Sequence, residues 1–208
     1  MITRLFSQLD EWRRLPNYQL ERRADIFFAI YLPLIFEEVF SCNVIDILPE
    51  FPIRIGTIYP SVPINKSYKI DYIVYADNSR AFLVELKTDN SSIRESQIKY
   101  YLKTIELGYR SLLDGLLEIY QASSYKSKYE CLLQRLVNNG SLKKIGNGYK
   151  TLDAFSIYKD PIFIKPTAKE GDIGHILTFN QIAKILEKES DPFTHRFIKS
   201  LQDWSITV

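Results

Sequence analysis

Residues 68–87 of the chain are YKIDYIVYADNSRAFLVELK. β-Branched and aromatic residues dominate both halves of this segment, and such residues favour extended backbone. Asp77-Asn78-Ser79 separates the two halves, and short polar residues of this kind are typical of a turn. The pattern therefore predicts two strands, at 68–76 and 81–87, that are joined as a hairpin.

The direction of the charged side chains depends on the register of this hairpin. Glu85 and Lys87 are two residues apart on one strand, so they point to the same face. A hairpin centred on Asn78 places Asp71 opposite Glu85, so that Asp71 points to the same face. A register shifted to place Asp71 opposite Lys87 also keeps the three side chains on one face. A register that pairs Asp71 with Leu86 would place it on the other face. The three-residue turn at 77–79 favours the first arrangement.

Three side chains converge if the favoured register holds. The carboxylates of Asp71 and Glu85 would lie about 5 Å apart on neighbouring strands. Such a pair repels unless one acid keeps its proton or a cation binds, and Mg²⁺ prefers carboxylate oxygens and retains several waters. A bound metal can polarise a phosphate and activate water, while Lys87 can neutralise charge in the transition state. The alternative is a structural ion pair between Glu85 and Lys87, with Asp71 as a polar edge residue.

The rest of the chain alternates between helical and extended patterns. Helices are expected at 3–14, 18–41, 93–121, 126–138, 180–189 and from 192 onward, strands at 53–58, 154–158, 162–165 and 175–179, and a small hairpin at 142–150. Pro33 is expected to kink or split its helix, and Gly108 and Gly115 to weaken theirs. The order predicts an α/β or α+β fold, with a mixed central sheet flanked by helices, in a single domain over 1–208.

Charge is distributed unevenly along the chain. The net charge is only +2, but residues 60–150 hold 14 Lys/Arg against nine Asp/Glu. A local basic surface of this kind can hold a phosphate backbone. The longest uncharged apolar run, residues 26–36, is far shorter than the roughly 20 residues that span a bilayer. No secretory signal pattern and no cysteine framework is present, so a cytoplasmic protein without membrane contact is expected.

The hairpin segment resembles the PD-(D/E)XK nuclease superfamily, which includes restriction enzymes, Holliday-junction resolvases and RecB-like exonucleases. The matching residues are Lys69-Ile70-Asp71 and Phe82-Leu83-Val84-Glu85-Leu86-Lys87. The resemblance implies a restriction-endonuclease-like core of helix, three strands, helix and strand. It also implies metal ligation by Asp71 and Glu85, a catalytic Lys87, and Mg²⁺ as cofactor with Mn²⁺ as a substitute. Ile70 departs from the proline of the motif's name.

The resemblance extends to the helix after the motif. RecB-like nucleases carry a Gln followed by a Tyr in that helix, close to the active site. Gln97 and Tyr101 hold these places and lie one turn apart on a shared face. The resemblance thus implies catalytic roles for both residues, and an ordinary polar helix start is the alternative.

An acid in the first helix completes the metal site in many family members. Glu21 is preferred for this role, because it precedes an apolar segment that ends in Leu32-Pro33-Leu34. A solvated acid at a helix start, where the helix dipole favours it, is the alternative. The competing acids of the same helix are Asp25, Glu37 and Glu38.

The resemblance covers about residues 18–105 and, more loosely, 162–165. The expected nuclease core is therefore 18–105 plus 152–180, with a helical and hairpin insertion at 122–150. Lysines of this insertion could form a wing-like contact with nucleic acid, although a plain decorated insertion is the alternative. The lysines in question are Lys143, Lys144 and Lys150.

The expected function is Mg²⁺-dependent hydrolysis of DNA phosphodiester bonds. DNA is the expected partner, and the resemblance also allows a homodimer or a larger nuclease or repair complex. The alternative is a catalytically inactive nuclease-fold module that binds DNA or a protein. No histidine metal motif and no glycine-rich phosphate loop points to another chemistry.

Overall fold

A computed structural model of the chain divides it into two compact units. The described residues are 1–62, 64–89 and 95–206. Unit 1 comprises Met1–Asn43, Glu85–Arg94 and Ile162–Val208. Unit 2 comprises Val44–Val84 and Glu95–Pro161. The expected single domain over 1–208 stays a prediction, and the expected insertion at 122–150 falls within unit 2.

Unit 2 is built on an antiparallel meander. Its strands are β1 (Val44–Arg54), β2 (Ser67–Ala76) and β3 (Arg80–Leu86), with β3 continuing past Val84 into unit 1. A short strand, β6 (Ser156–Ile157), pairs with β3 in parallel. The helices of this unit are α3 (Ile55–Ile58), α4 (Glu95–Ala122) and α5 (Ser127–Asn138). A separate hairpin consists of β4 (Leu142–Ile145) and β5 (Gly148–Thr151).

The register between β2 and β3 is the one that the turn predicted. The pairs run from Tyr72 opposite Val84 to Ala76 opposite Arg80, so they are centred on Asn78. Ser79 adopts φ +57, a left-handed conformation that turn residues supply more readily than strand residues. The predicted hairpin and its centre are therefore confirmed.

The strand expected at 53–58 is wrong in its position. β1 begins at Val44 and continues through Pro49 and Pro52, while Ile55–Ile58 forms the short helix α3. β1 lies at the end of the strand order with β2 as its neighbour, and an edge strand tolerates prolines because one side needs no N–H donors. The strand therefore runs through both prolines and ends at Arg54.

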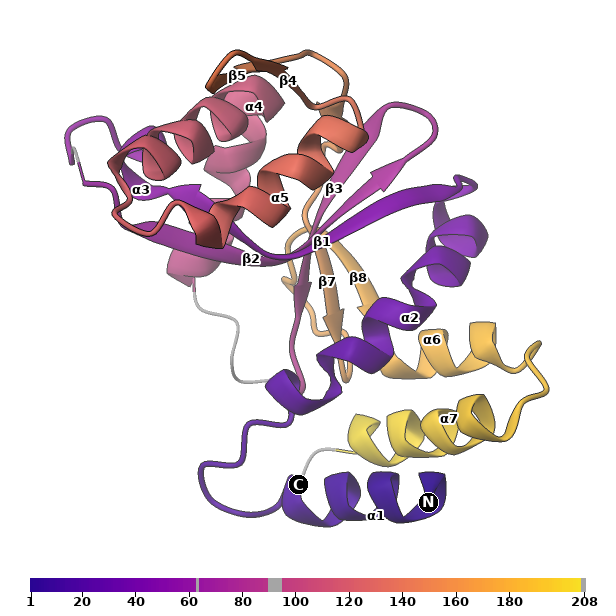
Figure 1. Cartoon of the computed structure of the whole chain (residues 1–208). Helices are drawn as coiled ribbons and strands as arrows, with labels where there is room; N and C mark the ends of the chain where they lie inside the picture. Colours follow the sequence, from indigo (N-terminus) through magenta and orange to yellow (C-terminus); the bar gives the residue numbers. More distant parts are fainter. Residues whose placement is uncertain (63, 90–94, 207–208) are drawn as a thin grey trace. The chain divides into compact units, whose positions relative to one another are not determined.

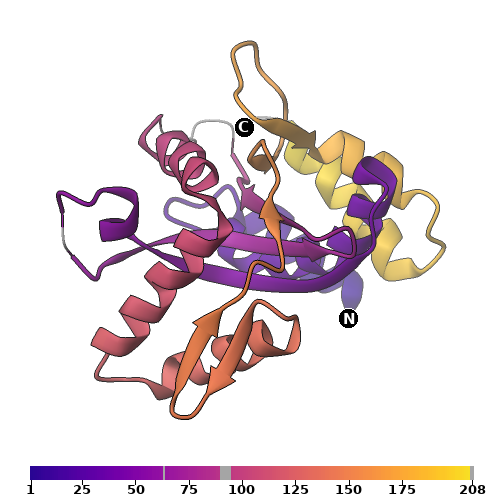
Figure 2. The same ribbon diagram turned by 90° about the horizontal axis from the view of Figure 1, so that it is seen from above.

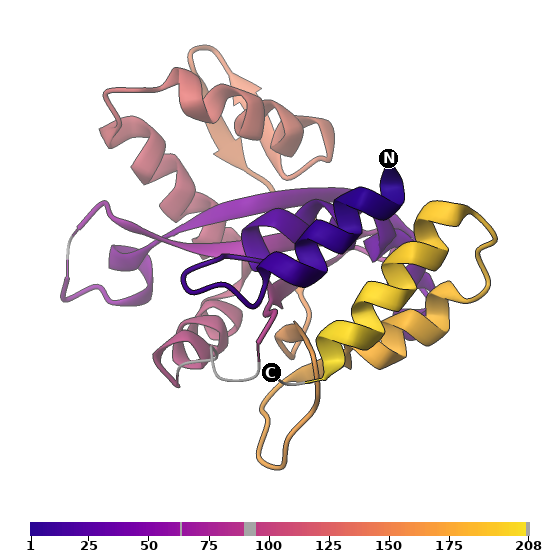
Figure 3. The same cartoon turned by 90° about the horizontal axis from the view of Figure 1, so that it is seen from below.

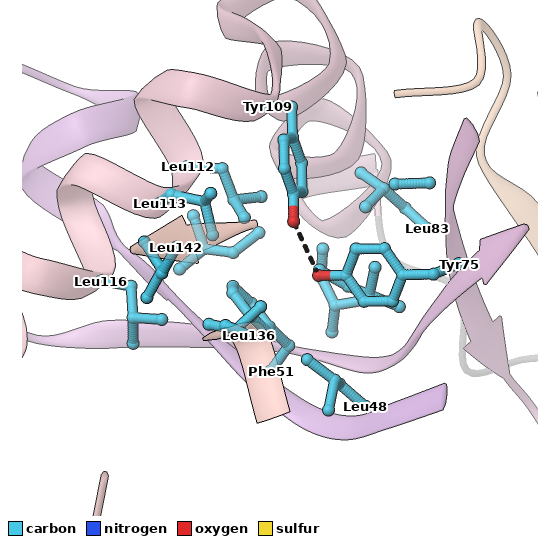
Figure 4. Close-up of a cluster of buried hydrophobic side chains, with 14 of the residues drawn as sticks. Leu48, Phe51, Tyr75, Leu83, Tyr109, Leu112, Leu113, Leu116, Leu136 and Leu142 are labelled. Carbon is cyan, nitrogen blue, oxygen red and sulfur yellow. Dashed lines mark hydrogen bonds between the residues drawn. The ribbon is translucent and has the colours of Figure 1, made fainter. Parts of the chain in front are cut away.

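One apolar cluster holds the helices of unit 2 on its sheet (Figure 4). Leu48, Phe51 and Leu83 of the strands meet Leu113 and Leu116 of α4 in this cluster. Burial of such side chains contributes about 1.5–3 kcal/mol each. The packing therefore fixes the sheet against α4 more strongly than local helix propensity could.

A buried polar chain crosses the same cluster. The hydroxyl of Tyr109 donates to Ser141 Oγ at 2.5 Å. It also lies 3.2 Å from the hydroxyl of Tyr75 (Figure 4). Burial raises the pKa of Tyr109 to about 12 and raises the pKa of Tyr75 well above its usual value. Both phenols therefore favour the neutral form in the folded state.

The long helix α4 is interrupted and closely packed at its two glycines. Gly108 has φ +81 and ψ 168, which are not helical values. Figure 2 shows that α4 is bent along its length. Gly115 remains helical, but a Cβ at this position would lie 2.4 Å from Thr57 Oγ1. The predicted weakening is confirmed at Gly108, whereas Gly115 allows α3 to approach α4.

Unit 1 is mainly helical. Its helices are α1 (Ile2–Trp12), α2 (Glu21–Phe40), α6 (Phe179–Leu186) and α7 (Pro192–Ser205). β7 (Ile162–Lys165) and β8 (His175–Thr178) pair in parallel. Helices α1 and α7 lie side by side (Figures 1 and 3). Asp10 ties them together, because its carboxylate accepts hydrogen bonds from Ser200 and from the Trp204 indole, each at 2.8 Å.

The expected fold class is confirmed at the level of a mixed α/β chain. Antiparallel pairing in the meander and parallel pairing of β7 with β8 make the strand arrangement mixed, and helices pack on the strands of both units. α2 runs unbroken through Pro33, and the strand expected at 154–158 is reduced to β6. Among the described residues, none of the helices is long and apolar enough to cross a membrane.

We predict that alkaline pH weakens unit 2 through Tyr109. A folded-state pKa raised to about 12 means that the neutral phenol stabilises the fold fully below the unfolded-state pKa of about 10. This contribution is lost as the pH rises from 10 to 12. Urea unfolding across that range should therefore show a falling free energy, and the fall should lessen in Tyr109→Phe. The exposed Tyr125→Phe serves as the control, and an equal fall in both variants would refute the assignment.

Candidate functional site

A buried ion pair lies at the end of β3, in unit 1. The ammonium of Lys87 is 2.6 Å from Glu85 Oε1, and the two residues are only 6% and 2% exposed. The backbone N–H of Lys87 donates to the carbonyl of Ile164 at 2.8 Å, which holds this end of β3 beside β7. Burial of either charge alone would be costly, so each requires the other.

Glu21 joins this pair from the first turn of α2. Both of its carboxylate oxygens lie 3.4 Å from the Lys87 ammonium, and its side chain is one third exposed. The position at the start of a helix favours a carboxylate, because free N–H groups and the helix dipole lie there. The preferred first-helix acid therefore contacts Lys87.

The competing acids of α2 are placed differently. The Asp25 carboxylate accepts a hydrogen bond from the N–H of Ile26 at 2.7 Å. Glu38 forms an exposed ion pair with Lys188, and Glu37 is exposed. Sequence spacing did not distinguish these acids from Glu21, because the choice depends on how β3 meets α2 within unit 1.

The charges of the Glu21–Glu85–Lys87 cluster do not balance when both acids are ionised. Two carboxylates then surround one ammonium, which leaves one negative charge in a partly desolvated place. Burial raises the pKa of Glu21, the attraction of Lys87 lowers it, and the repulsion of Glu85 raises it again, so that the net direction is upward. The cluster therefore gains from a further proton or cation.

The donor chemistry of the cluster suits a hard cation. Mg²⁺ is commonly bound through one or two carboxylates, with waters and substrate phosphates as its other ligands. Glu21 and Glu85 supply two carboxylates in unit 1. In residues 1–62, 64–89 and 95–206, no group of three or more His, Cys, Asp or Glu side chains is arranged to hold a metal ion. A metal here would thus depend on water and substrate oxygens.

The other predicted site residues belong to unit 2. Asp71 is a half-buried residue of β2, directly before Tyr72, and Gln97 is half-buried in the first turn of α4. Tyr101 is fully buried in the apolar cluster, and its hydroxyl donates to the carbonyl of Val84 at 3.5 Å. The structure therefore gives Tyr101 a place in the core of unit 2 and a contact to the strand that leads into Glu85.

β2 departs from simple alternation at Asp71. Ile70 and Ile73 both belong to the apolar cluster, although strict alternation would send them to opposite faces. On β1, Glu50 has φ +51, and the pairing with β2 keeps its register on either side of it. The positive φ of Glu50 thus marks an irregularity of β1 in the segment that pairs with β2 around Asp71.

A second buried lysine was missed by the sequence analysis. Lys165 ends β7, is 1% exposed, and donates to both oxygens of Asp172 at 2.8 and 3.0 Å. Burial opposes the ionisation of Asp172, but hydrogen bonds from Lys165 and from the N–H of Lys169 outweigh it and lower its pKa. The available signal was an apolar strand, Ile162–Lys165, that ends in a lysine.

Comparisons with family models, with curated proteins and with solved structures found no match to this chain. The function must therefore be argued from its own side chains.

We predict that Lys87 is required for the stability of unit 1. Lys87→Met leaves two carboxylates without their ammonium, and loss of one partner of a buried pair costs about 3–5 kcal/mol. Lys188→Met is the matched control, because it removes an exposed pair with Glu38 that is worth about 0–1 kcal/mol. Urea unfolding compares the two variants, and equal losses would show that the Glu85–Lys87 pair has no special role.

Proposed function

We propose that the chain is a Mg²⁺-dependent nuclease that hydrolyses phosphodiester bonds of DNA. The observation that carries this proposal is the buried Glu85–Lys87 pair, to which α2 brings Glu21. A structural ion pair needs one acid for its ammonium, whereas this lysine has two acids that keep an excess of negative charge. Such an excess suits a site where a cation binds along with a phosphate.

The second carboxylate across the hairpin is proposed to be Asp71. The confirmed register pairs Tyr72 with Val84, and one further step along both strands would pair Asp71 with Glu85. Glu85 would then hold the metal with one neighbouring acid and with water and substrate oxygens, and the metal would supply Lewis-acid polarisation of the phosphate and of a water. The proposed fold is accordingly the restriction-endonuclease-like core, which the resemblance of residues 69–87 suggested.

The chain's own residues have distinct proposed tasks. Lys87 donates hydrogen bonds to the attacking water and to a phosphate oxygen, where negative charge grows in the transition state. Hydrolysis forms one bond from water oxygen to phosphorus, breaks the bond to the leaving oxygen, and delivers a water proton to that oxygen. Tyr101 positions the end of β3 through its contact with Val84, and Gln97 is proposed to orient the substrate from the same helix.

A catalytically inactive module that binds DNA or a protein is the second candidate. One observation favours it: Lys87 already contacts both Glu21 and Glu85, and an internal cation can substitute for a metal. In that case the cluster would be a structural device. The two candidates differ in whether divalent metal binds at Glu85.

We predict DNA cleavage that depends on Glu85 and Asp71. The purified chain should cut at least one of linear, nicked, branched or single-stranded DNA when Mg²⁺ or Mn²⁺ is present. Glu85→Gln and Asp71→Asn keep the side-chain shape but remove the charge, and each should lower the cleavage rate by about a hundredfold or more. Glu38→Gln, an exposed acid of α2, should leave the rate unchanged.

Calorimetry separates the outcomes when no cleavage is seen. Binding of Mn²⁺ that is lost in Glu85→Gln but kept in Glu38→Gln would support a metal site. Absence of Mn²⁺ binding together with absence of cleavage would favour the inactive module. Cleavage that persists in both acid variants would contradict the proposed site.

A further inference from the structure

The positive charge of the middle segment is concentrated in one part of unit 2. Residues 60–121 hold eight Lys/Arg and eight Asp/Glu, whereas residues 122–150 hold six and one. The second range contains α5 and the β4–β5 hairpin, which lie side by side (Figure 2). The basic excess noted in the sequence therefore belongs to these elements and to no part of β2 or β3.

Three lysines of the β4–β5 hairpin are exposed and contribute no ion pair to the described part of the fold. We call Lys143, Lys144 and Lys150 the hairpin lysines. Lys143 lies directly opposite Lys150, and Lys144 lies opposite Tyr149. Like charges directly opposite destabilise a strand pair, and no ion pair to these lysines is seen in the described part of the chain. The placement of Lys143 opposite Lys150 thus lowers the stability of the hairpin and requires another explanation.

The hairpin is held firmly in unit 2. Leu142 is buried in the apolar cluster, and the Tyr149 ring meets the Tyr120 ring edge-on, with centroids 6.0 Å apart. The turn contains Gly146, which has a φ of +55, and glycine adopts such a positive φ without strain. Arg135 of α5, by contrast, is occupied by Asp46 and by the carbonyl of Ile47. The hairpin lysines are therefore fixed in position while remaining exposed.

We propose that this hairpin binds the phosphate backbone of duplex DNA without reading its sequence. An ammonium is a compact point charge that suits phosphate oxygens. Apart from Lys143 and Lys150, the same face carries Ile145 and Gly148, which cannot form the forked hydrogen bonds that distinguish bases. The choice of DNA as the polyanion rests on the proposed nuclease function, and the hairpin adds a binding surface outside the Glu21–Glu85–Lys87 cluster.

The test is the salt dependence of DNA binding by the full chain. Fluorescence anisotropy with a labelled duplex of random sequence, without divalent metal, gives the slope of log K against log salt. The hairpin variant Lys143→Gln/Lys144→Gln/Lys150→Gln should reduce that slope by about 1.8, at about 0.9 for each of the two phosphate contacts that Lys143 and Lys150 make from their shared face. The control Lys66→Gln/Lys184→Gln/Lys199→Gln loses the same charge from exposed positions and should keep the wild-type slope.

The outcomes separate this inference from the nuclease proposal. Equal slopes for the hairpin variant and the control would overturn the inference, whether or not the protein cleaves DNA. A smaller slope in the hairpin variant alone would support the inference, even if none of the variants cleaves DNA. The chain should bind duplex DNA more tightly than polyglutamate or duplex RNA. Equal affinity for either of these would overturn the assignment of DNA as the partner.

Discussion

The buried contact between Glu85 and Lys87 is the constraint on which the rest of the account depends. Neither charge could remain at the end of β3 without the other, because burial of an unpaired ion is costly. The pair gains Glu21 from α2, so that one helix and one strand end are joined by charge within unit 1. We propose that this charge is retained because the cluster serves the proposed reaction.

The strand β3 contributes residues to both units. Its first residues pair with β2 and lie over the apolar cluster of unit 2, and its last residues carry the charged cluster of unit 1. Tyr101 contacts Val84, the last residue before that change. We propose that phosphate chemistry takes place at the end of β3 and that the β4–β5 hairpin separately binds the backbone of the substrate through charge alone.

Local sequence patterns predicted most of the elements and the centre of the β2–β3 hairpin. They predicted these because Asp77-Asn78-Ser79 is a strong turn signal and both flanking segments are rich in β-formers. They failed at β1, where a strand was expected only at 53–58, although β1 runs from Val44 to Arg54 and, as an edge strand, accepts Pro49 and Pro52. Alternation also failed near Asp71, since Ile70 and Ile73 both lie in the apolar cluster of unit 2.

The candidate site was only partly accessible from sequence. Glu85 and Lys87 share a face by spacing alone, but the choice of Glu21 over Asp25, and the burial of Lys165, depend on tertiary packing. The most direct measurement is a crystal structure of the chain grown with Mn²⁺, with an anomalous difference map. The account predicts a Mn²⁺ peak on the Glu85 carboxylate, with Lys87 still beside it. An empty map around Glu85, with Mn²⁺ bound elsewhere or not at all, would contradict the account.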